Sequence, residues 1–207
     1  MDVLTQAKLQ RVKAVVIGAS AGGVDALLGI LSGLPASFGL PLVVVLHLSE
    51  SHHSQLAEIF RLRTPMQVRE AADKDTLTPG TLYFAPPGYH LLVETDHSLS
   101  LSCEAPVHFS RPSIDVLMES AADAYGLNLA GIVLTGANAD GARGLARIGQ
   151  QGGLTVVQDP AEARMAAMPE AAIRLRQPDL ILDLKSIHSL LLEIGKNSCR
   201  TTTTSTS

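Results

Sequence analysis

A serine flanked by glycines is the first pattern in the sequence that suggests a reaction. Gly18-Ala19-Ser20-Ala21-Gly22 fits G-x-S-x-G, in which a nucleophilic serine occupies a sharp turn between a strand and a helix. A dinucleotide-binding loop is excluded because Ser20 replaces its middle glycine, and a phosphate-binding loop because Val24 and Asp25 follow Gly23. A serine that only caps the following helix is the structural alternative.

A histidine and an aspartate are placed where they can assist that serine. His47 directly follows the apolar residues 42–46, and Asp140 lies in the loop after the apolar residues 130–134. The carboxyl ends of parallel strands meet at one edge of a sheet, so we expect Ser20, His47 and Asp140 to lie close together. Neutral histidine is the usual base for serine, and a carboxylate on its far nitrogen fixes its tautomer. The alternatives are a structural histidine and an aspartate that caps a helix.

Alternating apolar and amphipathic segments must position these residues. Short β-branched runs predict strands at residues 14–17, 42–46, 130–134, 154–157 and 180–182, and amphipathic patterns predict helices at residues 24–34, 55–64, 113–125, 141–150 and 187–194. This alternation predicts an α/β fold, with a doubly wound, mostly parallel sheet and helices on both faces. Residues 67–103 contain four short segments between Pro-Gly and polar turns, which predict an antiparallel hairpin insertion.

Composition limits the domain organisation and the function. The 207 residues predict a lead-in over residues 1–12, one domain over 13–195 and a disordered Ser/Thr-rich tail over 196–207. A net charge of −4 and 3% aromatic residues argue against a nucleic-acid-binding surface. We expect no metal or other cofactor, because the chain lacks a ligand motif. We also expect a cytoplasmic protein, because no apolar run reaches the length of a membrane span or signal core.

The sequence resembles the catalytic domain of the chemotaxis protein-glutamate methylesterases (CheB type) over residues 15–194. The resemblance rests on IGASAGG (17–23), the strand end at His47, PGTLYFAPPGYH (79–90), RPSIDVL (111–117), LTG (134–136), DG (140–141) and MPEAA (168–172). It implies a Ser20-His47-Asp140 triad that hydrolyses glutamate γ-methyl esters on the cytoplasmic helices of chemoreceptors and releases methanol. Deamidation of receptor glutamines is the second activity implied.

Two departures from the family pattern affect substrate choice and regulation. The family commonly has Gly-Met-Gly before the Asp140 loop, whereas this chain has Ala137 and Asn138 after Gly136. The backbone amides near Ala21 and Ala137 remain the expected oxyanion donors. No phospho-receiver domain fits before the first strand, so we expect a fragment or a stand-alone esterase, with a separate receiver protein as a possible partner. A small-molecule carboxylesterase and a non-catalytic binding module are the alternatives.

Overall fold

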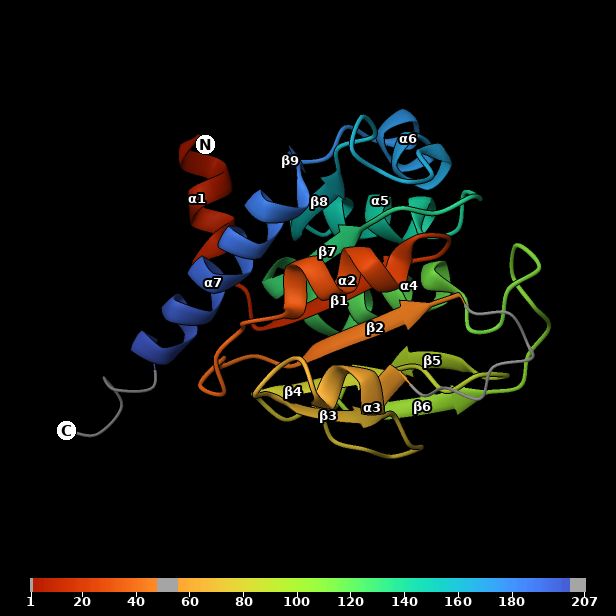
Figure 1. Cartoon of the computed structure of the whole chain (residues 1–207), viewed down its shortest axis with the longest axis horizontal. Coiled ribbons are helices and arrows are strands. Elements are labelled where there is room, and N and C mark those ends of the chain that lie inside the picture. The colour runs from red at the N-terminus through yellow and green to blue at the C-terminus, as the bar shows by residue number, and fades with distance from the viewer. Residues whose placement is uncertain (1, 48–55, 202–207) are drawn as a thin grey trace.

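A seven-stranded parallel sheet forms the centre of the molecule (Figure 1). The computed structural model describes residues 2–47 and 56–201, with side chains as far as residue 197. The strand order is β3-β4-β2-β1-β7-β8-β9, and each neighbouring pair is parallel. The strands are β1 (Ala14–Ala19), β2 (Leu42–Leu46), β3 (Gln67–Glu70), β4 (Thr81–Phe84), β7 (Leu129–Val133), β8 (Leu154–Gln158) and β9 (Leu180–Leu182).

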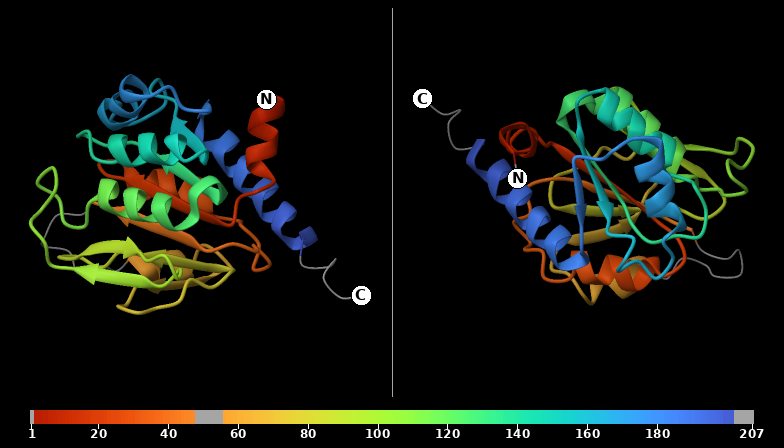
Figure 2. Two further views of the ribbon diagram at one scale, coloured as in Figure 1. Left: turned by 180° about the vertical axis from the view of Figure 1, so that it is seen from behind. Right: turned by 90° about the horizontal axis from the view of Figure 1, so that it is seen from above.

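Helices cover both faces of the sheet, as the alternating sequence pattern predicts. They are α1 (Val3–Leu9), α2 (Gly23–Leu31), α3 (Leu56–Arg61), α4 (Ile114–Tyr125), the 3₁₀ turn η1 (Gly126–Asn128), α5 (Ala142–Gln150), α6 (Ala167–Leu175) and α7 (Leu184–Thr201). Figure 1 shows α2 and α7 in front of the sheet, and Figure 2 shows α4 and α5 behind it. Side chains that alternate along β1 enter two cores, with Ile17 packed toward the first face and Val16 toward the second.

The segment between residues 67 and 103 differs from the prediction. Only β5 (His90–Val93) and β6 (Leu99–Ser102) pair as an antiparallel hairpin, whereas β3 and β4 pair in parallel and extend the main sheet. The ten residues between β3 and β4 return the chain to the end of the sheet at which β3 began. The strand β4, which follows Pro79-Gly80, therefore runs parallel to β3. Gly80 N–H donates to Leu40 O at 3.2 Å, and Gly80 O accepts from Gln67 N–H at 3.2 Å.

Both terminal predictions require correction. The predicted loose lead-in contains α1, which Asp2 caps by accepting the Thr5 N–H at 2.7 Å. The predicted disordered tail begins too early, because residues 196–201 continue α7. This helix packs Ile187, Leu191 and Ile194 into the first core. Residues 202–207 lie outside the described chain.

Within residues 2–47 and 56–201, no helix has both the length and the apolar character needed to cross a membrane.

Candidate active site

The loop after β1 places Ser20 between a central strand and a helix. Ser20 N–H donates to Thr135 O at 2.9 Å, and Gly23 N–H donates to Ser20 O at 2.7 Å. Gly22 caps α2 with a φ of 81°, a left-handed conformation that glycine adopts without strain. The half-buried Ser20 therefore occupies the predicted sharp turn at the carboxyl edge of the sheet.

His47 occupies the corresponding position at the end of the neighbouring strand. Ala19 and Leu46 are register partners, and His47 N–H donates to Ala19 O at 3.0 Å. Because neighbouring strands lie about 4.8 Å apart, His47 and Ser20 leave the sheet side by side. Within the described residues, the Ser20 hydroxyl makes no hydrogen bond with the imidazole. Nδ1 is the ring nitrogen left for such a contact, because Nε2 is bound to Asp140.

Asp140 pairs with His47 across the strand ends, although 93 residues separate them in sequence. Its Oδ2 lies 2.9 Å from His47 Nε2, which fixes the proton of a neutral imidazole on Nε2. The carboxylate is fully buried and also accepts from Ile114 N–H at 2.8 Å, Asp115 N–H at 2.9 Å and the Ser113 hydroxyl at 2.8 Å. Burial raises the pKa of Asp140, but these hydrogen bonds outweigh it and hold the pKa below its ordinary value.

A second buried aspartate, Asp115, completes a reciprocal arrangement with Asp140. Asp140 stands just before α5 but binds the first amides of α4. Asp115 lies in the first turn of α4, and its Oδ1 accepts from Gly141 N–H at 2.9 Å and Gly144 N–H at 2.8 Å at the start of α5. We call Asp115 and Asp140 the crossed carboxylates. Negative charge is favourable at both helix N-termini, so this pair fixes α4, α5 and the Asp140 loop together.

Asp115 is a site residue that sequence reasoning missed. Its position in the first turn of α4 predicted only a favourable interaction with that helix's own dipole. The residues it binds begin 26 positions later, and no local spacing indicates such a contact. Its Oδ2 also lies 3.2 Å from Arg143 Nε and 3.4 Å from His108 Nε2, so basic side chains cover the outer side of this carboxylate.

His90 holds the α4 N-terminus from the other side. It is almost fully buried, and its Nδ1 accepts from Ser113 N–H at 3.2 Å. Nε2 must then donate to Ala105 O, which lies 3.1 Å away. These bonds give His90 a structural role, because they position Ser113, whose hydroxyl binds Asp140.

Ala21 and Ala137, the predicted oxyanion donors, lie in two loops that are joined. The Thr135 hydroxyl donates to Ala21 O at 2.9 Å, which ties the Ser20 loop to the loop after β7. Both alanines are exposed. In the described part of the chain, neither backbone N–H donates to a protein acceptor, so both remain free for a ligand oxygen.

One group of metal-ligand side chains occurs among the described residues. Ligand atoms of His108, Asp115 and Asp140 all lie within 4.8 Å of one another. Amide, hydroxyl, imidazole and guanidinium donors already bind the oxygens of both carboxylates. A cation would have to displace them, so the geometry fits a hydrogen-bonded ion cluster better than a metal site. Two further histidines that could ligate a metal, His52 and His53, lie outside the described residues.

Comparisons with known proteins converge on one family. A family model described as CheB methylesterase matches residues 15–191. A relative from Leptospira interrogans, provisionally named a protein-glutamate methylesterase/protein-glutamine glutaminase, is 44% identical over 90% of this chain and 96% of its own length. A protein-glutamate methylesterase/protein-glutamine glutaminase from Anaeromyxobacter dehalogenans is 39% identical over 92% of this chain, but only 55% of its own. The CheB methylesterase catalytic domain of Thermotoga maritima superposes with a TM-score of 0.84 at 30% identity, covering 88% of this chain and 98% of that structure.

Proposed function

The chain belongs to the CheB methylesterase family, and we propose that it is a serine hydrolase that demethylates glutamate γ-methyl esters on methyl-accepting chemoreceptors. The observation that carries this proposal is the arrangement of three side chains at the carboxyl ends of the central strands. Ser20 and His47 leave adjacent strands side by side, and Asp140 binds the Nε2 of His47 at 2.9 Å. Relatives named as methylesterases share most of the chain, which supports the choice of ester.

The geometry supports a role for each residue of the proposed triad. Nδ1 of His47 accepts the proton of the Ser20 hydroxyl as Oγ attacks the ester carbonyl. The Ser20 side chain rotates toward Nδ1 as substrate binds, a tightening that is common between free and substrate-bound sites. Asp140 holds Nε2–H and stabilises the imidazolium that forms.

Backbone amides then stabilise the tetrahedral intermediate. The N–H groups of Ala21 and Ala137 carry no protein acceptor and suit the developing oxyanion. Methanol departs with the proton held by His47, and the same histidine activates the water that hydrolyses the acyl-enzyme. Attack on a glutamine side-chain amide, with ammonia as the leaving group, accounts for the second activity named in the relatives.

Methanol release from a methylated chemoreceptor fragment tests this proposal. We expect release by the wild type and a loss of at least about 10⁴-fold in Ser20→Ala. Ser189→Ala, which changes an exposed serine of α7, is the matched control and should retain full activity. A fluorophosphonate probe should label the wild type and the control but not Ser20→Ala.

The outcomes separate the competing functions. Turnover of a small acyl ester without methanol release from the receptor would replace the proposal with a small-molecule carboxylesterase. The exposed, short Ala137 beside the site is the feature that would admit such a substrate. Absence of both turnover and labelling would indicate a binding module on the same fold.

A further inference from the structure

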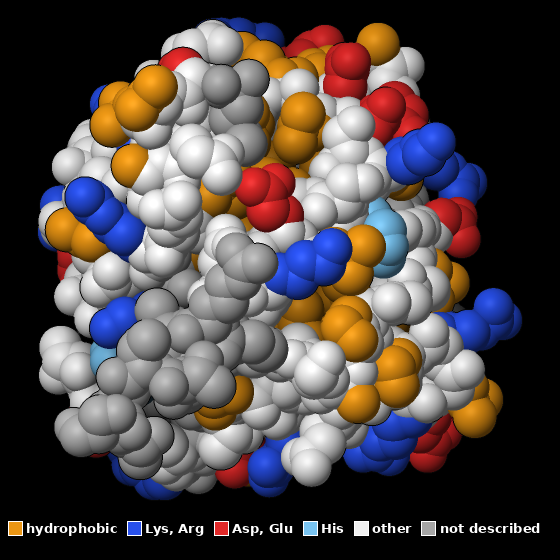
Figure 3. All heavy atoms as spheres, turned by 90° about the vertical axis from the view of Figure 1, so that its left-hand side faces the viewer, with side chains coloured by type: hydrophobic (Ala, Val, Ile, Leu, Met, Phe, Trp, Pro, Cys, Tyr) orange, Lys and Arg blue, Asp and Glu red, His pale blue; other side chains and the backbone are white. Residues whose placement is uncertain are grey.

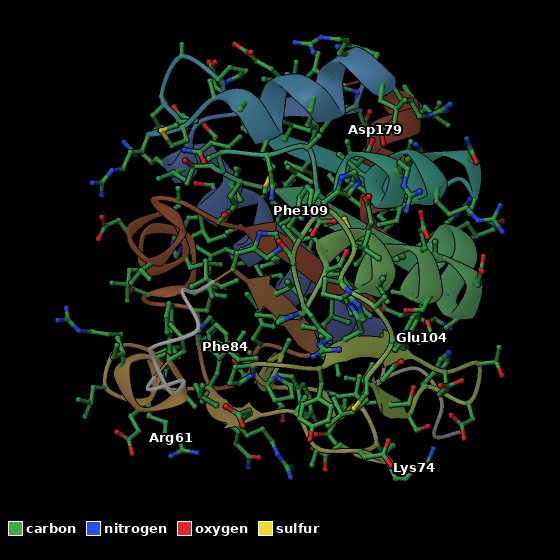
Figure 4. The ribbon with its side chains drawn as sticks, turned by 90° about the vertical axis from the view of Figure 1, so that its right-hand side faces the viewer. Arg61, Lys74, Phe84, Glu104, Phe109 and Asp179 are labelled. Atoms are coloured by element: carbon green, nitrogen blue, oxygen red, sulfur yellow. The ribbon has the colours of Figure 1, made fainter. Side chains whose placement is uncertain are left out.

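An exposed aromatic residue stands on a strained turn near the candidate triad. Val107 and Ser110 exchange two backbone hydrogen bonds, of 3.1 and 2.8 Å, so His108 and Phe109 form the tip of a two-residue turn. Their φ angles are 48° and 61°, a left-handed region that bulky residues rarely adopt. Phe109 is fully exposed, at 104% of its reference area, and lies near the middle of the edge viewed in Figure 4.

Strain and exposure together indicate that the Phe109 ring has a use outside the fold. A strained backbone and an exposed phenyl ring both destabilise the isolated chain, and such features concentrate at binding sites. Aromatic side chains are also frequent anchors in protein interfaces. His108 Nε2 lies 3.4 Å from Asp115 Oδ2, so the turn is fixed to the crossed carboxylates and thus to the triad.

A basic groove starts beside this turn and runs between α5 and α6. Its first part has a volume of about 290 Å³, with Ala139, Ala142 and Leu175 among its apolar lining. The adjoining part, of about 250 Å³, shares Arg143 and Leu175 with the first. We call the two parts the docking groove. It begins at Ala139, one residue before Asp140, so a chain lying in it ends beside the loop that carries Asp140.

The charge of the docking groove selects its ligand. Every titratable side chain found lining it in the described structure is basic, namely His108, Arg143, Arg174 and Arg176. Arg143 is engaged with Asp115 and Glu119, but Arg174 is 78% exposed and has only a loose 4.0 Å contact with Glu170. On the opposite face, shown in Figure 3, basic and acidic side chains are interspersed around separate hydrophobic patches.

We propose that Phe109 and the docking groove bind the substrate segment flanking the esterified glutamate, and that this segment is acidic. The inference rests on the proposed methylesterase function. A segment with small apolar side chains on one side fits the part of the docking groove that alanines line, as amphipathic helices fit apolar grooves. Its carboxylates meet Arg174 and the other basic groups of the rim, and Phe109 packs against its apolar side.

Two synthetic helical peptides, each with one glutamate γ-methyl ester, test the proposal. The ester is flanked by glutamates in one peptide and by lysines in the other, and methanol release gives kcat and KM. The wild type should have the lower KM for the acidic peptide. Phe109→Ala should raise that KM about 5- to 30-fold, and Arg174→Glu should abolish or invert the charge preference.

Matched control variants and a small ester separate the contribution of peptide docking from that of the triad. Leu62→Ala removes another exposed apolar side chain, and Arg11→Glu makes the same charge reversal before β1, at the opposite edge of the sheet. Neither should change KM for the acidic peptide. Turnover of p-nitrophenyl acetate, which is too small to fill the groove, reports the triad alone. The ratio of peptide to small-ester kcat/KM should fall in Phe109→Ala and Arg174→Glu.

The proposal is overturned if the wild type treats both peptides alike, or if the two groove variants raise KM no more than their controls. Failure of the proposed function has a different signature, in which the wild type cleaves p-nitrophenyl acetate but neither peptide. Docking is then tested by fluorescence anisotropy with the acidic peptide and Ser20→Ala protein. Binding weakened by Arg174→Glu but not by Arg11→Glu supports the groove, and absence of binding refutes it.

Discussion

Replacing Asp140 by asparagine changes one oxygen of a buried carboxylate that binds two helices and the His47 ring. Oδ1 accepts from the Ser113 hydroxyl and Asp115 N–H, and Oδ2 accepts from Ile114 N–H and His47 Nε2. An asparagine amide has one oxygen and one NH₂ group. In either orientation, NH₂ therefore faces a backbone N–H that has lost its acceptor.

Each orientation of the amide has its own defect. With NH₂ on the His47 side, it donates to Nε2, moves the ring proton to Nδ1 and so removes the proposed base for Ser20. With NH₂ on the other side, the buried N–H of Asp115 loses its acceptor. An unsatisfied buried donor destabilises by about 1–3 kcal/mol, and a lost charge at a helix N-terminus by about 0.3–2 kcal/mol. We expect a decrease of about 2–4 kcal/mol in the free energy of unfolding at pH 7 and, from the orientation with NH₂ toward His47, a decrease of about 10⁴-fold in kcat.

The pH dependence follows from the lowered pKa of Asp140 in the folded protein. A carboxyl with a lower pKa in the folded than in the unfolded state stabilises the fold fully above its unfolded pKa, which is about 3.9. That stabilisation is lost as the pH falls through the folded pKa. The stability difference between wild type and Asp140→Asn should therefore be constant above about pH 5 and shrink below about pH 4.

Urea unfolding followed by circular dichroism at pH 7 and at pH 3.5 measures both effects, and methanol release measures kcat. Asp123→Asn is the matched control, because Asp123 forms an exposed ion pair with Arg147 and should contribute less than about 1 kcal/mol. The reasoning is refuted if Asp140→Asn destabilises no more than this control at pH 7. A stability difference that widens on acidification would refute the assigned direction of the pKa shift.

Three further predictions test other parts of the structure. A Cβ on Gly18 would lie 2.2 Å from Ile114 Cγ2, so Gly18→Ala should lower the urea midpoint by the equivalent of about 1–3 kcal/mol, whereas a clash-free site would show no change. Asp115→Asn should lower kcat more than it raises KM, because Asp115 positions the Asp140 loop; an effect confined to KM would contradict this role. Burial raises the pKa of Tyr125 to about 12, so Tyr125→Phe should remove the component near pH 12 from an ultraviolet titration, and its persistence would disprove the assignment.

The central strands, and the positions of Ser20, His47 and Asp140 at their carboxyl ends, could be predicted from the sequence because their signals are local. Runs such as residues 42–46 are apolar on both faces, and Ser20 and His47 directly follow such runs. The sequence was a poorer guide to which strands pair where the strands are short. β3 buries only Val68 of its four residues, as an exposed hairpin strand would, but its long return loop makes it parallel to β4.

The contacts that complete the candidate site depend on tertiary structure. The link from Asp115 to the α5 amides joins residues that are distant in sequence, and either aspartate alone has an adequate local explanation as a capping residue. The Phe109 turn was missed because two consecutive left-handed residues are expected to be glycine or asparagine. Its contact with Asp115, through His108 Nε2 at 3.4 Å, is one that no local pattern in the sequence encodes.

The crossed carboxylates also have a consequence for how the molecule opens. Asp115 lies in the first turn of α4 and binds amides at the start of α5, whereas Asp140 precedes α5 and binds amides at the start of α4. Neither helix N-terminus can therefore fray without breaking hydrogen bonds that hold the other. In native-state hydrogen exchange, the amides of Ile114, Asp115, Gly141 and Gly144 should therefore open as one cooperative unit with a single free energy. Asp140 belongs to that unit, so under the proposed function a chain in which α4 and α5 are not yet packed lacks the group that orients the proposed base and does not hydrolyse esters during folding.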